Sequence, residues 1–196
     1  MPLYLVTPPA VDPVSLEEMK LHLRADHFEE DFSIASYIKA ATGRLDGPGG
    51  MLGRCLIAQT WRVTFDRFPN EIELPLPPCM SVDSISYLDA LGELVEIPAS
   101  DYRVTGIGAL SGARILPARG KSWPLTFETD SVQVEFTAGF GTSPADVPEA
   151  LRVAVMMHAA HLYATRESVA VGSGIGVAEI PHGHGDLIRD YRVWSF

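Results

Sequence analysis

The clearest pattern along the chain is a segment in which apolar side chains occur on nearly every side of a predicted helix. Asp146 is a good N-cap, Pro148 falls in the first turn, and the helix should run to about Arg166. A helix that is apolar all round must be covered on every side, and a chain of 196 residues has little else to cover it with. We therefore expect neighbouring subunits to bury part of this helix. The residues expected at these subunit contacts are Leu151, Val155, Met156 and Leu162.

Two further helices are predicted near the start of the chain. Ser15 and Glu18 form a capping box, in which the serine caps the helix and the glutamate reaches back to the serine. A longer helix begins at Asp26 or His27 and ends in the glycine-rich breaker at residues 47–50. The proline-rich residues before both helices are expected to form an extended arm. The apolar stripe predicted on the longer helix consists of Phe28, Phe32, Ala35, Ile38, Ala41 and Leu45.

Between residues 57 and 141 the hydrophobic pattern changes to strict alternation. Trp61, Val63 and Phe65 alternate with polar residues, which predicts a half-buried strand. Pro75 lacks a backbone donor, so the strand expected at residues 71–76 should lie at an edge. Further short strands are expected at residues 82–88, 94–97, 102–105, 113–116 and 132–136. We predict an antiparallel unit of about six or seven strands.

These elements predict an α+β fold in a single domain, residues 1–196. Its helical part should comprise residues 14–56 and 145–196, with a last short helix at residues 186–191. The β part, residues 57–141, is inserted between the two helical segments. The expected core therefore has two N-terminal helices, one long C-terminal helix and one short terminal helix, with a small antiparallel β unit attached.

Composition narrows the range of functions. The formal net charge is −10, which argues against a protein that grips phosphate backbones with clustered Lys and Arg. An acidic surface is compatible with DNA that passes by without specific binding. Cys55 and Cys79 lie in no metal-ligand spacing and are predicted to be small buried residues, without a disulfide. The sequence shows no signal peptide and no apolar run long enough to cross a bilayer, so we expect a protein made in a reducing cytoplasm.

No residue pattern indicates catalysis, a cofactor or a metal site. His158 and His161 lie three residues apart on the apolar helix, and a core or subunit contact is favoured over a metal pair because a third ligand is missing. His182 and His184 lie in a small-residue segment without a rigid surround. The glycine-rich stretch that contains Gly172, Gly174 and Gly176 follows a helix, lacks a P-loop Lys, and is predicted to be a flexible linker.

Large apolar side chains are concentrated in the last ten or so residues. Chain ends are usually polar unless they are held in place, so this tail either packs on its own domain or docks on another protein. We favour docking, because aromatic anchors supply much of an interface's energy. The anchor residues are Leu187, Ile188, Tyr191, Val193, Trp194 and Phe196.

Several segments resemble phage head–tail connector proteins, also called adaptor or head-completion proteins. The resemblance lies in the strand that ends in FTAGFG, the Pro-capped apolar helix that ends in ATRE, and the closing IPHG … LIRDYRVW. The opening PVSLEEMKLHLR, followed by EEDFSIASYIKAATGRL, is also similar to this family. The resemblance spans the chain and is weakest in the β part.

The resemblance implies a structural role in a tailed phage or a phage-derived gene-transfer particle. Such adaptors assemble as rings, typically of about twelve copies, beneath the portal. They extend the DNA channel and provide a docking surface for a stopper or tail protein, without enzymatic activity. The expected location is the virion neck at the head–tail interface, after synthesis in the host bacterial cytoplasm, and the C-terminal segment would engage the portal.

Two alternatives remain open from the sequence. One is a different neck component, such as a stopper or a tail terminator. The other is a small metal-dependent enzyme that uses the histidines, which stoichiometric metal in the purified protein would indicate.

Overall fold

The computed structural model describes residues 1–165 and 182–193, and the chain divides into two compact units. The first, here called the β unit, comprises residues 1–10 and 54–142. The second, the helical unit, comprises residues 11–53 and the chain from residue 143 onward. The predicted α+β class is confirmed, because the strands of both sheets pair antiparallel and the helices belong to the other unit.

The β unit contains a five-stranded antiparallel sheet with the order β1-β2-β8-β4-β5. The strands are β1 (Leu3–Thr7), β2 (Gln59–Phe65), β4 (Cys79–Leu88), β5 (Leu94–Glu96) and β8 (Val132–Ala138). β8 lies at the centre and pairs in full register with β2, where Trp61 is opposite Phe136 and Val63 is opposite Val134. The segment expected to be a free arm is thus partly a strand, since β1 pairs with β2 at the sheet edge.

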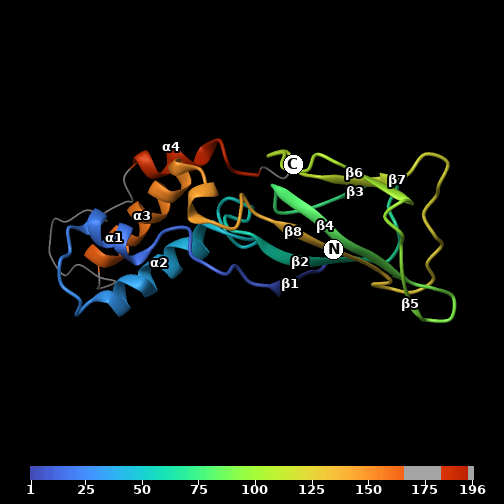
Figure 1. Cartoon of the computed structure of the whole chain (residues 1–196), viewed down its shortest axis with the longest axis horizontal. Coiled ribbons are helices and arrows are strands. Elements are labelled where there is room, and N and C mark those ends of the chain that lie inside the picture. The colour runs from blue at the N-terminus through green and yellow to red at the C-terminus, as the bar shows by residue number, and fades with distance from the viewer. Residues whose placement is uncertain (166–181, 194–196) are drawn as a thin grey trace, which may run out of the picture. The chain divides into compact units, whose positions relative to one another are not determined.

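A second sheet of three strands lies along one side of the first and has the order β3-β7-β6 (Figure 1). These strands are β3 (Ile72–Glu73), β6 (Tyr102–Thr105) and β7 (Arg114–Pro117). β3 is an edge strand, as Pro75 predicts, but it is much shorter than residues 71–76. Residues of both sheets share one core cluster, which includes Ile85, Ile115 and Phe136 without exposed surface.

The helical unit consists of α1 (Leu16–Leu23), α2 (Asp31–Leu45), a short 3₁₀ helix (Pro144–Asp146), α3 (Glu149–Ala164) and α4 (His182–Arg189). The predicted capping box is confirmed: the Glu18 N–H donates to Ser15 Oγ, and the Ser15 N–H donates to Glu18 Oε2 at 2.9 Å. α2 packs against α3, which also contacts α4. The core side chains include Met19, Ile34 and Leu45.

Several helix boundaries differ from the predictions for local reasons. α2 begins at Asp31 rather than at residue 26 or 27. Asp146 caps the short 3₁₀ helix together with Ser143, so α3 begins only after Pro148. The last helix lies earlier than expected, at His182–Arg189.

Candidate functional site

The subunit contacts predicted on α3 are only partly available at the surface. Leu151 and Val155 have no exposed surface, because α3 turns them into the core of its own unit. They offer nothing to a neighbouring subunit, so the prediction is wrong for these two residues. Met156 and Leu162 are half-buried and keep surface that a partner can cover.

The predicted docking tail begins as a helix that packs on its own unit. Ile188 of α4 is only 2% exposed and His184 is 4% exposed. The Val193 N–H donates to the Leu52 carbonyl at 2.9 Å, which ties the chain after α4 to the loop after α2. Ile188 is therefore a core residue and the prediction for it is wrong, whereas Leu187, Tyr191 and Val193 keep exposed surface. Trp194 and Phe196 lie outside the described residues, as do the linker glycines Gly172, Gly174 and Gly176.

Two histidines that are distant in the sequence meet between α3 and α4. The ring centroids of His158 and His184 lie 5.8 Å apart with planes tilted by 40°. His158 Nδ1 and His184 Nε2 are both buried, and neither has a hydrogen-bond partner among the described residues. Burial lowers the pKa of both imidazoles, and the neighbouring His184, His161 and Arg44 lower the pKa of His158 further. Over residues 1–165 and 182–193, no group of three or more His, Cys, Asp or Glu side chains could hold a metal ion.

Both cysteines are thiols and are buried in the β unit, as predicted. Burial, reinforced by the nearby Asp83 carboxylate, raises the pKa of Cys79 to about 11. Since the thiolate is the nucleophilic form, the Cys79 thiol is unreactive near neutral pH.

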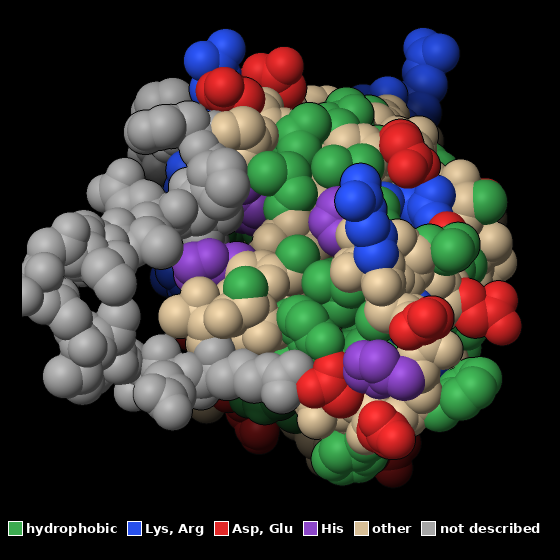
Figure 2. Space-filling model, turned by 90° about the vertical axis from the view of Figure 1, so that its left-hand side faces the viewer, with side chains coloured by type: hydrophobic (Ala, Val, Ile, Leu, Met, Phe, Trp, Pro, Cys, Tyr) green, Lys and Arg blue, Asp and Glu red, His purple; other side chains and the backbone are tan. Residues whose placement is uncertain are grey.

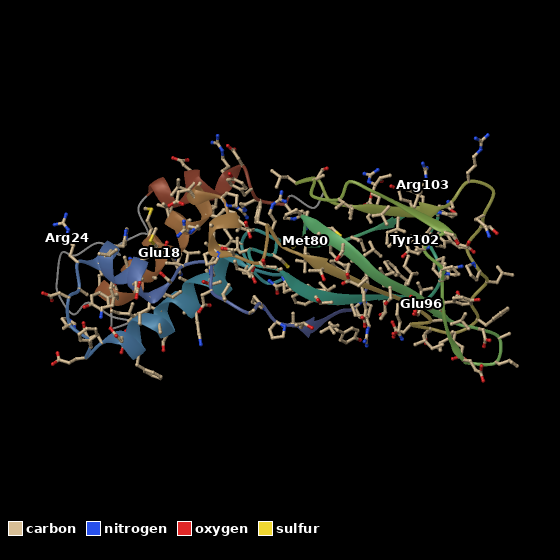
Figure 3. The ribbon with its side chains drawn as sticks, in the orientation of Figure 1. Glu18, Arg24, Met80, Glu96, Tyr102 and Arg103 are labelled. Carbon is tan, nitrogen blue, oxygen red and sulfur yellow. The ribbon has the colours of Figure 1, made fainter. Side chains whose placement is uncertain are left out.

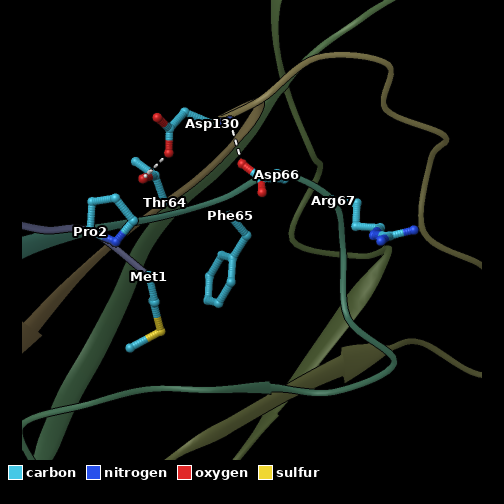
Figure 4. A pocket seen from close by; sticks show the side chains of 7 residues that line it. All are labelled: Met1, Pro2, Thr64, Phe65, Asp66, Arg67 and Asp130. Atoms are coloured by element: carbon cyan, nitrogen blue, oxygen red, sulfur yellow. Dashed lines mark hydrogen bonds between the residues drawn. The ribbon is translucent and has the colours of Figure 1, made fainter.

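A pocket of about 410 Å³ lies in the β unit between the start of β1 and the end of β2 (Figure 4). The carboxylates of Asp66 and Asp130, which line this pocket, already accept hydrogen bonds from within the chain. Asp66 Oδ1 accepts the Asp130 N–H at 3.0 Å, and Asp130 Oδ1 accepts the Thr64 hydroxyl at 2.8 Å. These bonds hold the end of β2 to the segment before β8. We therefore assign the polar groups of this pocket a structural role.

The surface of the helical unit shown in Figure 2 exposes hydrophobic side chains among acidic, basic and histidine side chains. Phe28 and Phe32 are exposed, contrary to the predicted stripe. The Lys20 ammonium lies 4.3 Å from the centre of the Phe28 ring and 2.6 Å from Asp31 Oδ1. The buried face of α2 instead consists of Ile34, Ile38, Ala41 and Leu45.

Both edges of the five-stranded sheet also expose apolar side chains, which the sequence analysis did not single out. On β1, Tyr4 and Leu5 are 53% and 48% exposed. On β5, Leu94 and Val95 are 58% and 37% exposed. Alternating apolar residues indicate a strand, but they do not show which strands lie at the two ends of a sheet.

Known structures resemble this chain along its full length. A chain in the neck of an empty gene transfer agent (GTA) particle, computed with C6 symmetry, matches at a TM-score of 0.79 and 28% identity. A chain in the virion of the native particle matches at 0.77 and 28%, and one in the native neck, computed with C12 symmetry, at 0.76 and 26%. Each match covers 100% of this chain and 97% of the other.

This chain resembles gene transfer agent neck proteins from end to end. The resemblance stated from the sequence, to neck proteins of tailed phages or phage-derived gene-transfer particles, is thereby confirmed. The location expected from the sequence, the neck of a virion, is that of these structural neighbours. No family model matches the chain, and no curated protein matches it. Among the described residues, no helix is long and apolar enough to span a membrane.

Proposed function

We propose that this protein is a head–tail adaptor. In this role it forms a ring beneath the portal of a phage-like particle, extends the DNA channel, and offers a docking surface to the stopper or tail. The observation that carries the proposal is the full-length similarity to chains of gene transfer agent particles, whose necks were computed with C6 and C12 symmetry. The whole chain would act as one adaptor domain, with the β part inserted into the helical part.

Rotational symmetry sets the form of the subunit contact. A closed ring, here of about twelve copies, uses heterologous contacts, in which each subunit presents two different faces to its two neighbours. On α3, the half-buried Met156 and Leu162 are the remaining candidates for part of such a contact. Leu187, Tyr191 and Val193, followed by Trp194 and Phe196, are the proposed portal-docking residues.

The charge supports a conduit rather than a DNA-binding surface. With a net charge of −10, the protein lacks the cationic excess that phosphate contacts require. A ring of acidic subunits repels the DNA backbone, so that DNA passes through without adhering. No cofactor is part of this function.

Electron microscopy of particles made without this chain tests the proposal. An adaptor is the first component after the portal, so its loss should give DNA-filled or leaking heads without a neck, beside free tails. Loss of a stopper or a tail terminator would instead leave an additional ring of density on the portal. If heads without this chain still join tails, the adaptor function is wrong.

Shortening the tail tests the proposed contact with the portal. Deletion of residues 194–196 leaves α4 and its contacts with α3 in place, so the helical unit should fold normally. We expect this variant to be lost from portal-bearing heads. A matched control replaces the exposed Leu21 on α1 by Ser and should assemble like the unaltered protein. Normal incorporation of the shortened chain would contradict portal docking by the tail.

A further inference from the structure

The β1 edge of the five-stranded sheet is unusually free of charge. Sheet edges of soluble proteins are commonly protected by charged side chains, because the outer backbone groups can pair with another strand. No charged side chain occurs in residues 1–11 of this acidic chain, and every residue of β1 except Leu3 is exposed. β1 is thus an apolar edge that is open to a further strand.

The opposite edge has a different chemistry. β5 is also exposed along its length and presents Leu94 and Val95 to solvent. Acidic residues lie at both ends of β5: Asp89 and Glu93 belong to the turn before it, and Glu96, labelled in Figure 3, is its last residue. The sheet therefore has one neutral edge and one acidic edge.

We propose that β1 of one copy pairs with β5 of the next copy, so that the sheet continues from subunit to subunit around the ring. This inference rests on the adaptor function proposed above and names its subunit contact in the β unit. Each strand of the sheet is antiparallel to its neighbours, so β1, β8 and β5 run in the same direction. If the rotation that relates two copies in the ring places β1 of one copy beside β5 of the next, these two strands run parallel.

The two edges match in length. The pairing of β1 with β2 becomes irregular between Leu5 and Thr7, which leaves Leu3–Leu5 as its regular part. β5 consists of three residues, Leu94–Glu96. Each edge thus offers one short regular stretch of equal length.

The faces of the two strands also match. Leu3 and Leu5 lie opposite Val63 and Trp61, which belong to the core cluster, so they point to the core face of the sheet. Val95 lies opposite Tyr87, which packs against the same cluster. Across the proposed contact, apolar side chains of Leu3, Leu5 and Val95 therefore continue one apolar face, while Tyr4 and Glu96 share the outer face.

Charge selects this pairing over the symmetric ones. Pairing of β5 with a second β5 would bring Glu93 and Glu96 of two copies close together, and like charges on adjacent strands are destabilising. Pairing of β1 with a second β1 would give an isologous contact, which closes a dimer and cannot propagate around a ring. Among pairings of the two edges of the five-stranded sheet, only that of β1 with β5 uses two different faces, as a cyclic assembly requires.

Crosslinking within particles tests the contact directly. Leu5→Cys and Val95→Cys would be combined, and the particles treated with a short bis-maleimide. Within one subunit the two edges are four strand spacings apart, or about 19 Å, so a short crosslinker joins different copies. We expect a ladder of crosslinked multimers from the double variant and only single chains or dimers from either single variant. A double variant that is incorporated but gives no ladder overturns the inference.

The sign of an added charge provides a second, independent test. Tyr4→Glu places a carboxylate beside the acidic β5 of the next copy and should be lost from particles, whereas Tyr4→Lys should be retained. Leu110→Glu, on the exposed loop between β6 and β7, is the control and should assemble normally. Thermal melting of each purified variant establishes that it folds.

Equal incorporation of the Glu and Lys variants, or equal loss of two folded variants, overturns the inference. These results differ from a failure of the adaptor function, in which the unaltered chain itself would be absent from the neck.

Discussion

The imidazole rings of His158 and His184 face each other across the contact between α3 and α4, with centroids 5.8 Å apart. Each ring has a buried nitrogen that bonds to no residue in the described part of the chain, and burial lowers the pKa of both side chains. The neighbouring His184, His161 and Arg44 lower the pKa of His158 further. Burial thus favours the neutral form of both histidines, and two protons would place like charges against each other.

We predict that acid loosens the packing of α4 on α3. The folded-state pKa of each histidine lies below its unfolded value of about 6.5, so the unfolded chain binds more protons in mild acid. Stability is therefore fully present above about pH 6.5 and is lost as the pH falls through the lower folded-state values. Denaturant titrations followed by the helical circular dichroism signal, from about pH 7 to about pH 5, measure this loss.

Matched variants identify the histidines responsible. His184→Met removes one titrating ring but keeps an apolar side chain of similar length, so its stability should vary less over this pH interval. His22→Gln on the exposed surface of α1 should keep the pH dependence of the unaltered protein. If the unaltered protein is equally stable at both ends of the interval, the buried pair does not control the contact.

Leu151 and Met156 should respond differently to truncation. Leu151 has no exposed surface, so Leu151→Ala leaves a cavity in the helical unit and should lower the free energy of unfolding by about 2–5 kcal/mol. Met156 is half-buried, and Met156→Ala should cost the isolated chain about 1 kcal/mol or less. Chemical denaturation compares the two variants. A larger loss at Met156 would show that the two residues have the opposite roles.

Local signals in the sequence predicted where helices form better than they predicted which faces of those helices are buried. The capping box at Ser15 and Glu18 could be read directly, because both partners lie within one turn of the same helix. The stripe on α2 was harder to predict, since Phe28 and Phe32 continue the helical period, yet Phe28 lies before α2, Phe32 lies in its first turn, and both side chains are exposed. Periodicity shows which residues share a face but not how much of that face is covered.

Relationships between distant segments could not be predicted. His158 and His184 were weighed separately, because nothing in their spacing shows that α4 folds back on α3. β1 was expected to be an arm, and its place beside β2 depends on a pairing across more than fifty residues. The exposed sheet edges follow from strand order, which the sequence pattern does not contain.

Gly139, in the FTAGFG segment, occupies a position where a side chain does not fit. It adopts a φ of +143°, and a Cβ there would lie 2.6 Å from the backbone nitrogen of Ala58. We predict that Gly139→Ala destabilises the β unit by about 3 kcal/mol or more, through steric overlap with backbone that cannot move aside. Gly120→Ala meets nothing within 4 Å and changes only the backbone strain, at a φ of +79°. It should cost about 1–2 kcal/mol. Equal melting temperatures for the two variants would contradict this difference.

Arg152 joins the start of α3 to the capping box of α1. Its Nη2 contacts Glu18, its Nη1 lies 2.7 Å from Glu149 Oε2, and its Nε donates to the Pro13 carbonyl at 3.2 Å. The hydrogen bond from the Ser15 N–H is the main cause that lowers the pKa of Glu18. The hydrogen bond and the charge of Arg152 lower this pKa further.

A double-mutant cycle with Arg152→Gln and Glu18→Gln should give a coupling energy of about 1 kcal/mol, because the arginine is largely buried and has several partners. The cross-strand pair Arg62 and Glu135 is the control, with both side chains more open to solvent than that of Arg152. Its coupling should be about 0.5 kcal/mol or less. Denaturant unfolding of the single and double variants measures both couplings. A coupling at Glu18 no larger than that of the sheet pair would mean that Arg152 does not hold α1 and α3 together.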